Sequence, residues 1–161
     1  MSHLETILLA TDGSAASQAA QEEALLLAAE VGARLLVVSV INTTAKLPAE
    51  AIVAGGGPRG LVDLREALVT GAQGIVERAR AAGAGATFLV WEGDPGEAIV
   101  AAAEAEGVDL IVVGSHGRGP VGRFLIGSVS DYVVRHARCP VLVVRPRQEA
   151  PLPARTETRP V

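Results

Sequence analysis

Short apolar runs alternate with longer segments of helical spacing along most of the chain. The runs are rich in Val, Ile and Leu, a composition typical of strands that are buried on both faces of a sheet. They predict five strands, at residues 6–11, 34–41, 86–92, 109–114 and 140–144. Strands that alternate with helices indicate repeated βα units, and hence an α/β fold with a mainly parallel sheet.

Two helices are predicted in the first half of the chain. The first has Ser14 as its N-cap and ends at Gly32, where a C-terminal glycine is favoured. The second is placed by the apolar positions between Leu61 and Ala79. Residues 42–60, which include the letters AGGGPRG, form a connection too long for a tight turn and are predicted to be a mobile flap.

Two more helices are predicted in the second half. Asp94 is suited to be an N-cap and Pro95 to be the first helical residue, so a third helix is expected from there to about Gly107. The last helix begins at Ser128 and stops before Pro140.

Composition favours a single domain in the cytoplasm. The chain has 161 residues, and 49% of them are apolar although only two Phe, one Trp and one Tyr are present. No apolar stretch approaches the about 18 residues that span a membrane, and the N-terminus lacks the basic start of a signal peptide. The single cysteine, Cys139, excludes an internal disulfide, and we expect it to be a buried small hydrophobic side chain.

Charge argues against a nucleic-acid partner. The 14 Lys and Arg residues are outnumbered by 18 Asp and Glu, which gives a net charge of −4. The basic residues are scattered rather than gathered into a tract that could follow a phosphate backbone.

A glycine-rich segment, VVGSHGRGPVGRFLIGSVSDYVV, joins the fourth predicted strand to the last helix. Loops at the carboxyl ends of parallel strands line the crevice in which open α/β sheets bind ligands. Glycines let backbone N–H groups approach phosphate oxygens, and the helix that starts at Ser128 adds unpaired N–H groups and the positive end of its dipole. The segment is therefore predicted to bind a phosphate-bearing ligand.

Parts of this segment imitate two better-known glycine motifs. Gly117, Gly119 and Gly122 match GxGxxG, but the match does not open the helix and lacks the acidic residue expected about 20 positions later. GRGPVGRF resembles a P-loop only with Arg123 in the lysine position and Phe124 in the hydroxyl position. Neither motif is therefore predicted.

The glycine spacing resembles that of the universal stress protein family. Gly114, Gly117, Gly127 and Ser128 fit the pattern G-x2-G-x9-G-[ST] of the ATP-binding branch of that family. Similar segments occur in order at ILLATDGS, LVVSVI, EGDPGEAI and CPVLVV, so the resemblance covers roughly residues 4–146.

The resemblance implies one doubly wound domain over residues 1–146, with a five-stranded parallel sheet of order 3-2-1-4-5 and helices on both faces. ATP would lie across the ends of the first and fourth strands, where the strand order reverses, and open sheets of this kind bind ligands at that position. A homodimer is expected, because the last strand, PVLVV, should lie at a sheet edge that needs cover. Residues 147–161 are predicted to be a disordered tail.

By the same resemblance, Gly114, Gly117, Gly127 and Ser128 form a phosphate cradle, with Val129 directly after it. The alternative is that these are turn glycines followed by an ordinary N-cap.

Three further residues complete the implied site. They come from the first predicted strand, the turn after it and the second predicted strand. Asp12 matches the family aspartate at the ribose and adenine end, or else caps the first helix. Val40 matches the residue whose backbone meets the adenine. Ala10 stands where many relatives have proline.

Three polar side chains within the glycine segment are further candidates. Arg118 and Arg123 are plausible partners for a polyphosphate, although exposed loop arginines are common. His116 could donate to a phosphate, but no second ligand at suitable spacing supports a metal site.

The leading hypothesis is a regulatory module that binds ATP with magnesium and is read by an unidentified signalling partner. The alternative is an enzyme, either a slow ATPase or a nucleotidyl-transfer relative. No carboxylate lies in the glycine segment to orient a water molecule, which argues against useful turnover. A flavodoxin-like electron carrier is disfavoured by the scarcity of aromatic residues.

Overall fold

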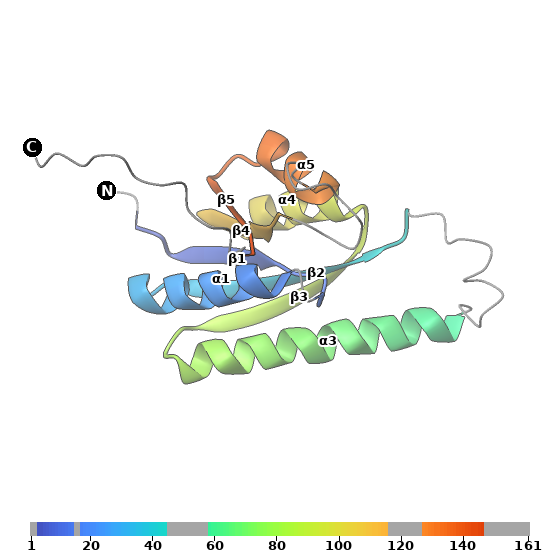
Figure 1. Ribbon diagram of the computed structural model, residues 1–161, viewed down its shortest axis with the longest axis horizontal. Helices are drawn as coiled ribbons and strands as arrows, with labels where there is room; N and C mark the ends of the chain where they lie inside the picture. Colours follow the sequence, from blue (N-terminus) through green and yellow to red (C-terminus); the bar gives the residue numbers. More distant parts are fainter. Residues whose placement is uncertain (1–2, 15–16, 45–57, 116–126, 147–161) are drawn as a thin grey trace, which may run out of the picture.

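The computed structural model describes residues 3–14, 17–44, 58–115 and 127–146. Strands and helices alternate along them (Figure 1). The elements are β1 (Thr6–Ala10), α1 (Gln18–Val31), β2 (Arg34–Asn42), α3 (Pro58–Ala81), β3 (Ala86–Gly93), α4 (Pro95–Ala105), β4 (Leu110–Gly114), α5 (Ser128–His136) and β5 (Val141–Val144). All five predicted strands are present, and no strand end differs from its prediction by more than one residue.

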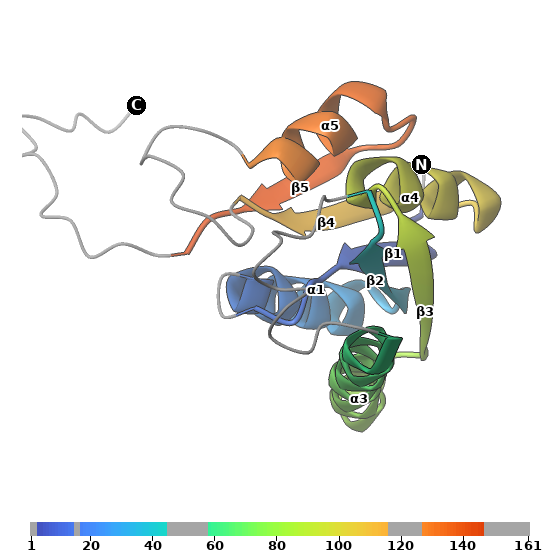
Figure 2. The ribbon, with the colours of Figure 1, turned by 90° about the vertical axis from the view of Figure 1, so that its right-hand side faces the viewer.

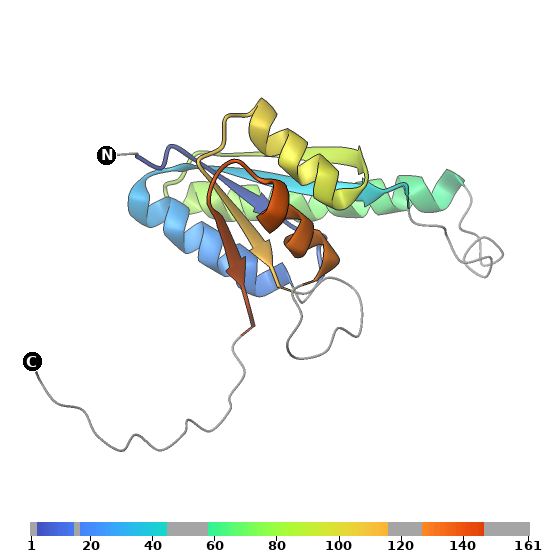
Figure 3. The same cartoon turned by 90° about the horizontal axis from the view of Figure 1, so that it is seen from above.

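The strands form one parallel sheet of order β3-β2-β1-β4-β5, which confirms the predicted order. Helices α1 and α3 cover one face of the sheet, and α4 and α5 cover the other (Figure 2). Seen from above, α5 begins at the end of the sheet where β4 finishes (Figure 3). The fold is therefore a doubly wound α/β sheet.

Strand β1 is buried along its whole length and supplies both cores. Because successive side chains of a strand point to opposite faces, Ile7 and Leu9 pack beneath α1 and α3, whereas Leu8 packs beneath α4 and α5. β1 pairs with β2 on one side and β4 on the other. It is the central strand of the sheet, and the connections that follow β1 and β4 lead to helices on opposite faces.

Helix α1 begins later than predicted. Its N-cap is Ser17, not Ser14. The N–H of Ser14 donates to Asp12 Oδ1 at 2.9 Å, and the Ser14 carbonyl accepts from Ser17 Oγ at 2.8 Å. Ser14 therefore belongs to an Asx turn that precedes the helix. The predicted end of the helix is confirmed, because Gly32 adopts a left-handed conformation with φ of 72°.

Helix α3 also differs from its prediction. It begins at Pro58, inside the segment 42–60 that was expected to be a connection, and β2 continues to Asn42. Proline suits the first turn of a helix because its missing N–H would have no acceptor there. Residues 45–57, the rest of the predicted flap, lie outside the described residues, as does the predicted tail 147–161.

Helices α4 and α5 start where the sequence predicted. Asp94 Oδ1 accepts from the N–H of Glu97 at 3.1 Å, and Pro95 is the first helical residue of α4. The two helices pack closely, since a Cβ added to Gly96 would lie 2.8 Å from the ring of Tyr132. A glycine at this contact lets the start of α4 pack against the middle of α5.

Two other expectations concern Cys139 and the membrane. Cys139, predicted to be a buried small hydrophobic side chain, is partly buried and packs against the core beneath α4 and α5. Burial raises the pKa of its thiol. Within the described parts of the chain, every helix is too short or too polar to cross a membrane.

Candidate functional site

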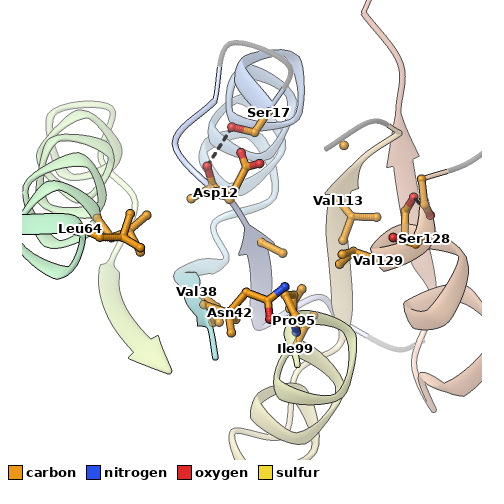
Figure 4. A pocket seen from close by; sticks show the side chains of 17 residues that line it. Asp12, Ser17, Val38, Asn42, Leu64, Pro95, Ile99, Val113, Ser128 and Val129 are labelled. Atoms are coloured by element: carbon orange, nitrogen blue, oxygen red, sulfur yellow. Dashed lines mark hydrogen bonds between the residues drawn. The ribbon is translucent and has the colours of Figure 1, made fainter. Parts of the chain in front are cut away.

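A cleft of about 410 Å³ opens at the carboxyl ends of β1 and β4, where the strand order reverses. Side chains from both sheet and helices surround it (Figure 4). The lining residues are Ala10, Thr11, Asp12, Ser17, Val38, Val40, Asn42, Leu64, Leu68, Pro95, Ile99, Val113, Gly114, Gly127, Ser128, Val129 and Ser130. A concave site of this size is typical of small-molecule binding.

One part of the cleft is apolar. Val38 and Val40 come from β2, Leu64 and Leu68 from α3, and Ile99 from α4. Figure 4 shows Leu64 and Ile99 reaching the cleft from different helices. A flat and weakly polar ring would therefore find apolar contacts from several elements.

The turn after β1 places a carboxylate in the cleft. Asp12 is the only charged side chain among the lining residues that the structure describes. Its Oδ1 accepts from the N–H of Ser14, and the carboxylate keeps further acceptor capacity for a ligand hydroxyl or a cation. The alternative prediction that Asp12 caps α1 is wrong, because Ser17 occupies the N-cap position.

Helix α5 begins at the cleft without a side-chain cap. Its N-cap is Gly127, and the first N–H groups of a helix have no acceptor within the helix. The N–H of Gly127 donates to the Ser115 carbonyl at 2.7 Å, which joins the residue before α5 to the residue after β4. The exposed Ser128 lies at the first helical position (Figure 4). This end of the cleft favours an anion.

The structure brings many of the predicted site residues together. Those that line the cleft are Ala10, Asp12, Val40, Gly114, Gly127, Ser128 and Val129. His116, Gly117, Arg118 and Arg123 lie outside the described residues.

Sequence reasoning missed most of the cleft wall: Thr11, Ser17, Val38, Asn42, Leu64, Leu68, Pro95, Ile99, Val113 and Ser130. A usable signal existed for part of this wall. Val38 and Asn42 lie two positions before and after Val40, so the two-residue period of β2 places all three on one face. No comparable local signal distinguishes Leu64 from a core leucine.

The chain is similar to universal stress proteins in sequence. The sequence profile of the Universal stress protein family matches residues 3–145. A universal stress protein of Thermus aquaticus, from the 3′ region of QAH/OAS sulfhydrylase, is 38% identical over 141 residues, which are 88% of this chain and 98% of the relative. Universal stress protein MJ0531 of Methanocaldococcus jannaschii is 34% identical over 148 residues, covering 89% of this chain and 84% of the relative.

Solved structures share the fold. Hypothetical protein MJ0577 of Methanocaldococcus jannaschii superposes with a TM-score of 0.78 at 28% identity, over 92% of this chain and 100% of that one. A universal stress protein in complex with cAMP superposes with a TM-score of 0.63 at 27% identity, over 89% of this chain and 98% of that one.

Proposed function

This chain belongs to the universal stress protein family, and we propose that it is a regulatory protein that binds ATP with magnesium in the cleft at the ends of β1 and β4. The observation that carries the proposal is the polarity of the cleft. Helix α5 begins uncapped on one side, and aliphatic side chains from β2, α3 and α4 line another. A nucleotide has the matching polarity, with anionic phosphates at one end and a flat base at the other.

The phosphates would lie at the start of α5. Gly114 and Gly127 line the cleft there without side chains, and Ser128 offers both its N–H and its hydroxyl as donors. The glycine spacing supports the same role for Gly117. His116, Arg118 and Arg123 belong to the same segment and are proposed to add charge and donors toward the phosphates.

The nucleoside would lie at the carboxyl ends of β1 and β2. Val38 and Val40 offer apolar contact to the base, and the backbone of Val40 is proposed to meet its edge. Asp12 would accept a hydrogen bond from a ribose hydroxyl. Ala10 and Val129 would line the middle of the ligand.

Magnesium fits this site as part of the nucleotide complex. Mg²⁺ neutralises charge on the phosphates when it is bound, and it commonly takes one or two carboxylates together with phosphate oxygens. Asp12 is the one carboxylate among the described lining residues, and this arrangement assigns it to the ribose. The donor set therefore suits a metal that arrives with ATP rather than one held by the protein alone.

A structural relative supports a nucleotide as ligand, since a universal stress protein with the same fold was solved in complex with cAMP. We propose binding without useful hydrolysis. If Asp12 engages the ribose, no other carboxylate of the described lining residues remains to orient an attacking water. Release of inorganic phosphate at rates useful to a catalyst would contradict this part of the proposal.

Thermal unfolding with Mg-ATP tests the binding. A ligand at 100 times its dissociation constant stabilises the native state by about 2.7 kcal/mol, so the melting temperature should rise clearly in millimolar Mg-ATP. Mg²⁺ alone and inorganic triphosphate serve as controls for the metal and the phosphate end. An unchanged melting temperature in a folded sample would reject the proposal.

We also propose that two copies associate through β5 in the cytoplasm. β5 lies at the edge of the sheet, and its four residues are only partly buried within one chain. Exposed strand edges are normally covered or paired. Light scattering at tens of micromolar should give the mass of a dimer, and the mass of a monomer with and without ATP would reject this arrangement.

A further inference from the structure

We propose that Thr11, Ser17 and Gln21 form a closed hydrogen-bond network that positions Asp12 for the ligand and does not itself bind the ligand. This inference rests on the proposed function. Thr11 and Ser17 both line the cleft, so each hydroxyl is at first sight a ligand donor. Both residues are buried, and the bond between their hydroxyls, at 3.0 Å, is drawn beside Ser17 in Figure 4.

The positions of the protons follow from the partners. Ser17 Oγ lies 2.8 Å from the Ser14 carbonyl, which has no proton to give, so Ser17 must be the donor. A hydroxyl has only one proton, and Thr11 is therefore the donor in the bond between Thr11 and Ser17. Any other group bonded to Thr11 Oγ1 must then donate to it.

Two such donors are present. The N–H of Gly13 lies 3.2 Å from Thr11 Oγ1, and the side-chain amide nitrogen of Gln21 lies 3.1 Å from it. The same amide nitrogen lies 3.4 Å from Ser17 Oγ, so this one NH2 group donates to both hydroxyls. Each hydroxyl thus donates one hydrogen bond and accepts two, which is its full capacity. Neither has a proton or a lone pair left for a ligand.

The network holds the turn that carries Asp12. The Thr11 N–H donates to the Val38 carbonyl of β2 at 3.0 Å, and the Thr11 hydroxyl holds the N–H of Gly13. Gly13 has φ of 73°, a conformation that glycine adopts without strain. Asp12 lies between these two anchored residues, and its carboxylate is oriented further by the N–H of Ser14. The Thr11 hydroxyl therefore ties the Asp12 turn to α1.

A double-mutant cycle separates positioning from direct contact. Thr11→Val replaces the hydroxyl by a methyl of similar size, and Asp12→Ala removes the carboxylate; Mg-ATP affinity is measured by calorimetry for both single variants, the double variant and the parent protein. We expect Thr11→Val to weaken binding about tenfold when Asp12 is present and less than about twofold in the Asp12→Ala background. Equal losses in both backgrounds, or no loss in either, would overturn the inference.

Two further variants guard against a merely structural effect. Thr11→Ser keeps the hydroxyl and should restore most of the affinity. Gln21→Leu removes the donor from a partly exposed position on α1, and its effect should also depend on Asp12. Circular dichroism checks that each variant is folded. If the parent protein itself fails to bind Mg-ATP, the proposed function falls and this inference falls with it; if only the coupling is missing, the inference alone is wrong.

Discussion

Helices α4 and α5 both begin at the cleft, where their first residues, Pro95 and Ser128, line the same space. Their starts differ in how the backbone donors are satisfied. In α4, Pro95 has no N–H, and Asp94 accepts from the N–H of Glu97. In α5, Gly127 has no side chain that could cap the helix. Two neighbouring helix starts therefore face one cleft with opposite capacity for an anion.

This difference indicates what a missing cap means at a binding site. A capped start is complete in itself and contributes stability, typically about 1 kcal/mol. An uncapped start keeps its N–H groups and its positive dipole end available to a ligand. Substitutions at the starts of α4 and α5 test this difference.

The largest effect is expected from Ser128→Asp. A carboxylate at the start of α5 should repel the phosphates and weaken ATP binding about a hundredfold, or about 2.7 kcal/mol, while it stabilises the ligand-free helix by about 0.3–1 kcal/mol. Calorimetry and thermal melting measure the two opposite changes. Ser128→Asn is the matched neutral control, and if it weakens binding as much as Asp does, charge at this helix start is not the cause.

A smaller effect, on stability alone, is expected from Gly96→Ala. The added Cβ would lie 2.8 Å from the Tyr132 ring, so α4 and α5 must shift apart, at a cost of about 2 kcal/mol in the free energy of unfolding. Urea denaturation measures it. Gly74→Ala in α3 is the control, because no atom lies within 4 Å of its added Cβ, and the helix should gain about 0.5–1 kcal/mol. Equal effects of the two changes would show that the contact with Tyr132 is not tight.

The smallest effect is expected from Asp94→Ala. Removal of the cap of α4 should lower the free energy of unfolding by about 1 kcal/mol. ATP affinity should stay within about twofold of the parent value, because Asp94 does not line the cleft. Denaturation and calorimetry on one preparation give both numbers. A tenfold loss of affinity would mean that the two helix starts act together on the ligand.

The strands were predictable from sequence almost to the residue. Short runs of branched apolar residues that are bounded by polar residues are typical of buried strands. The start of α4 was equally accessible, since both signals, Asp94 and Pro95, are local. The start of α1 was predicted wrongly. Asp12, Ser14 and Ser17 are all suitable caps, and the choice depends on Thr11 being anchored to β2, which lies far away in sequence.

The candidate site was predictable along the strand ends and at the glycine motif, but not along its helical wall. Leu64 and Leu68 have the same helical spacing as the core positions that follow them in α3. Whether a leucine faces the core or the cleft depends on how far α3 extends past the ends of the strands, which is a property of the assembled sheet. The start of α3 at Pro58 was missed because the glycines before it indicate a loop more strongly than the proline indicates a helix.

The central place of β1 has a consequence for the order in which a growing chain can complete the molecule. β1, β2 and β3 are all synthesised within the first 93 residues, and they form one continuous half of the sheet. The other edge of β1 stays open until residues 110–112 arrive to pair with it. The start of α5 follows later still, so the cleft proposed for the nucleotide is among the last parts to be made. On the proposed function, ATP would therefore stabilise only the final stage of folding during synthesis, and not the half of the sheet that forms first.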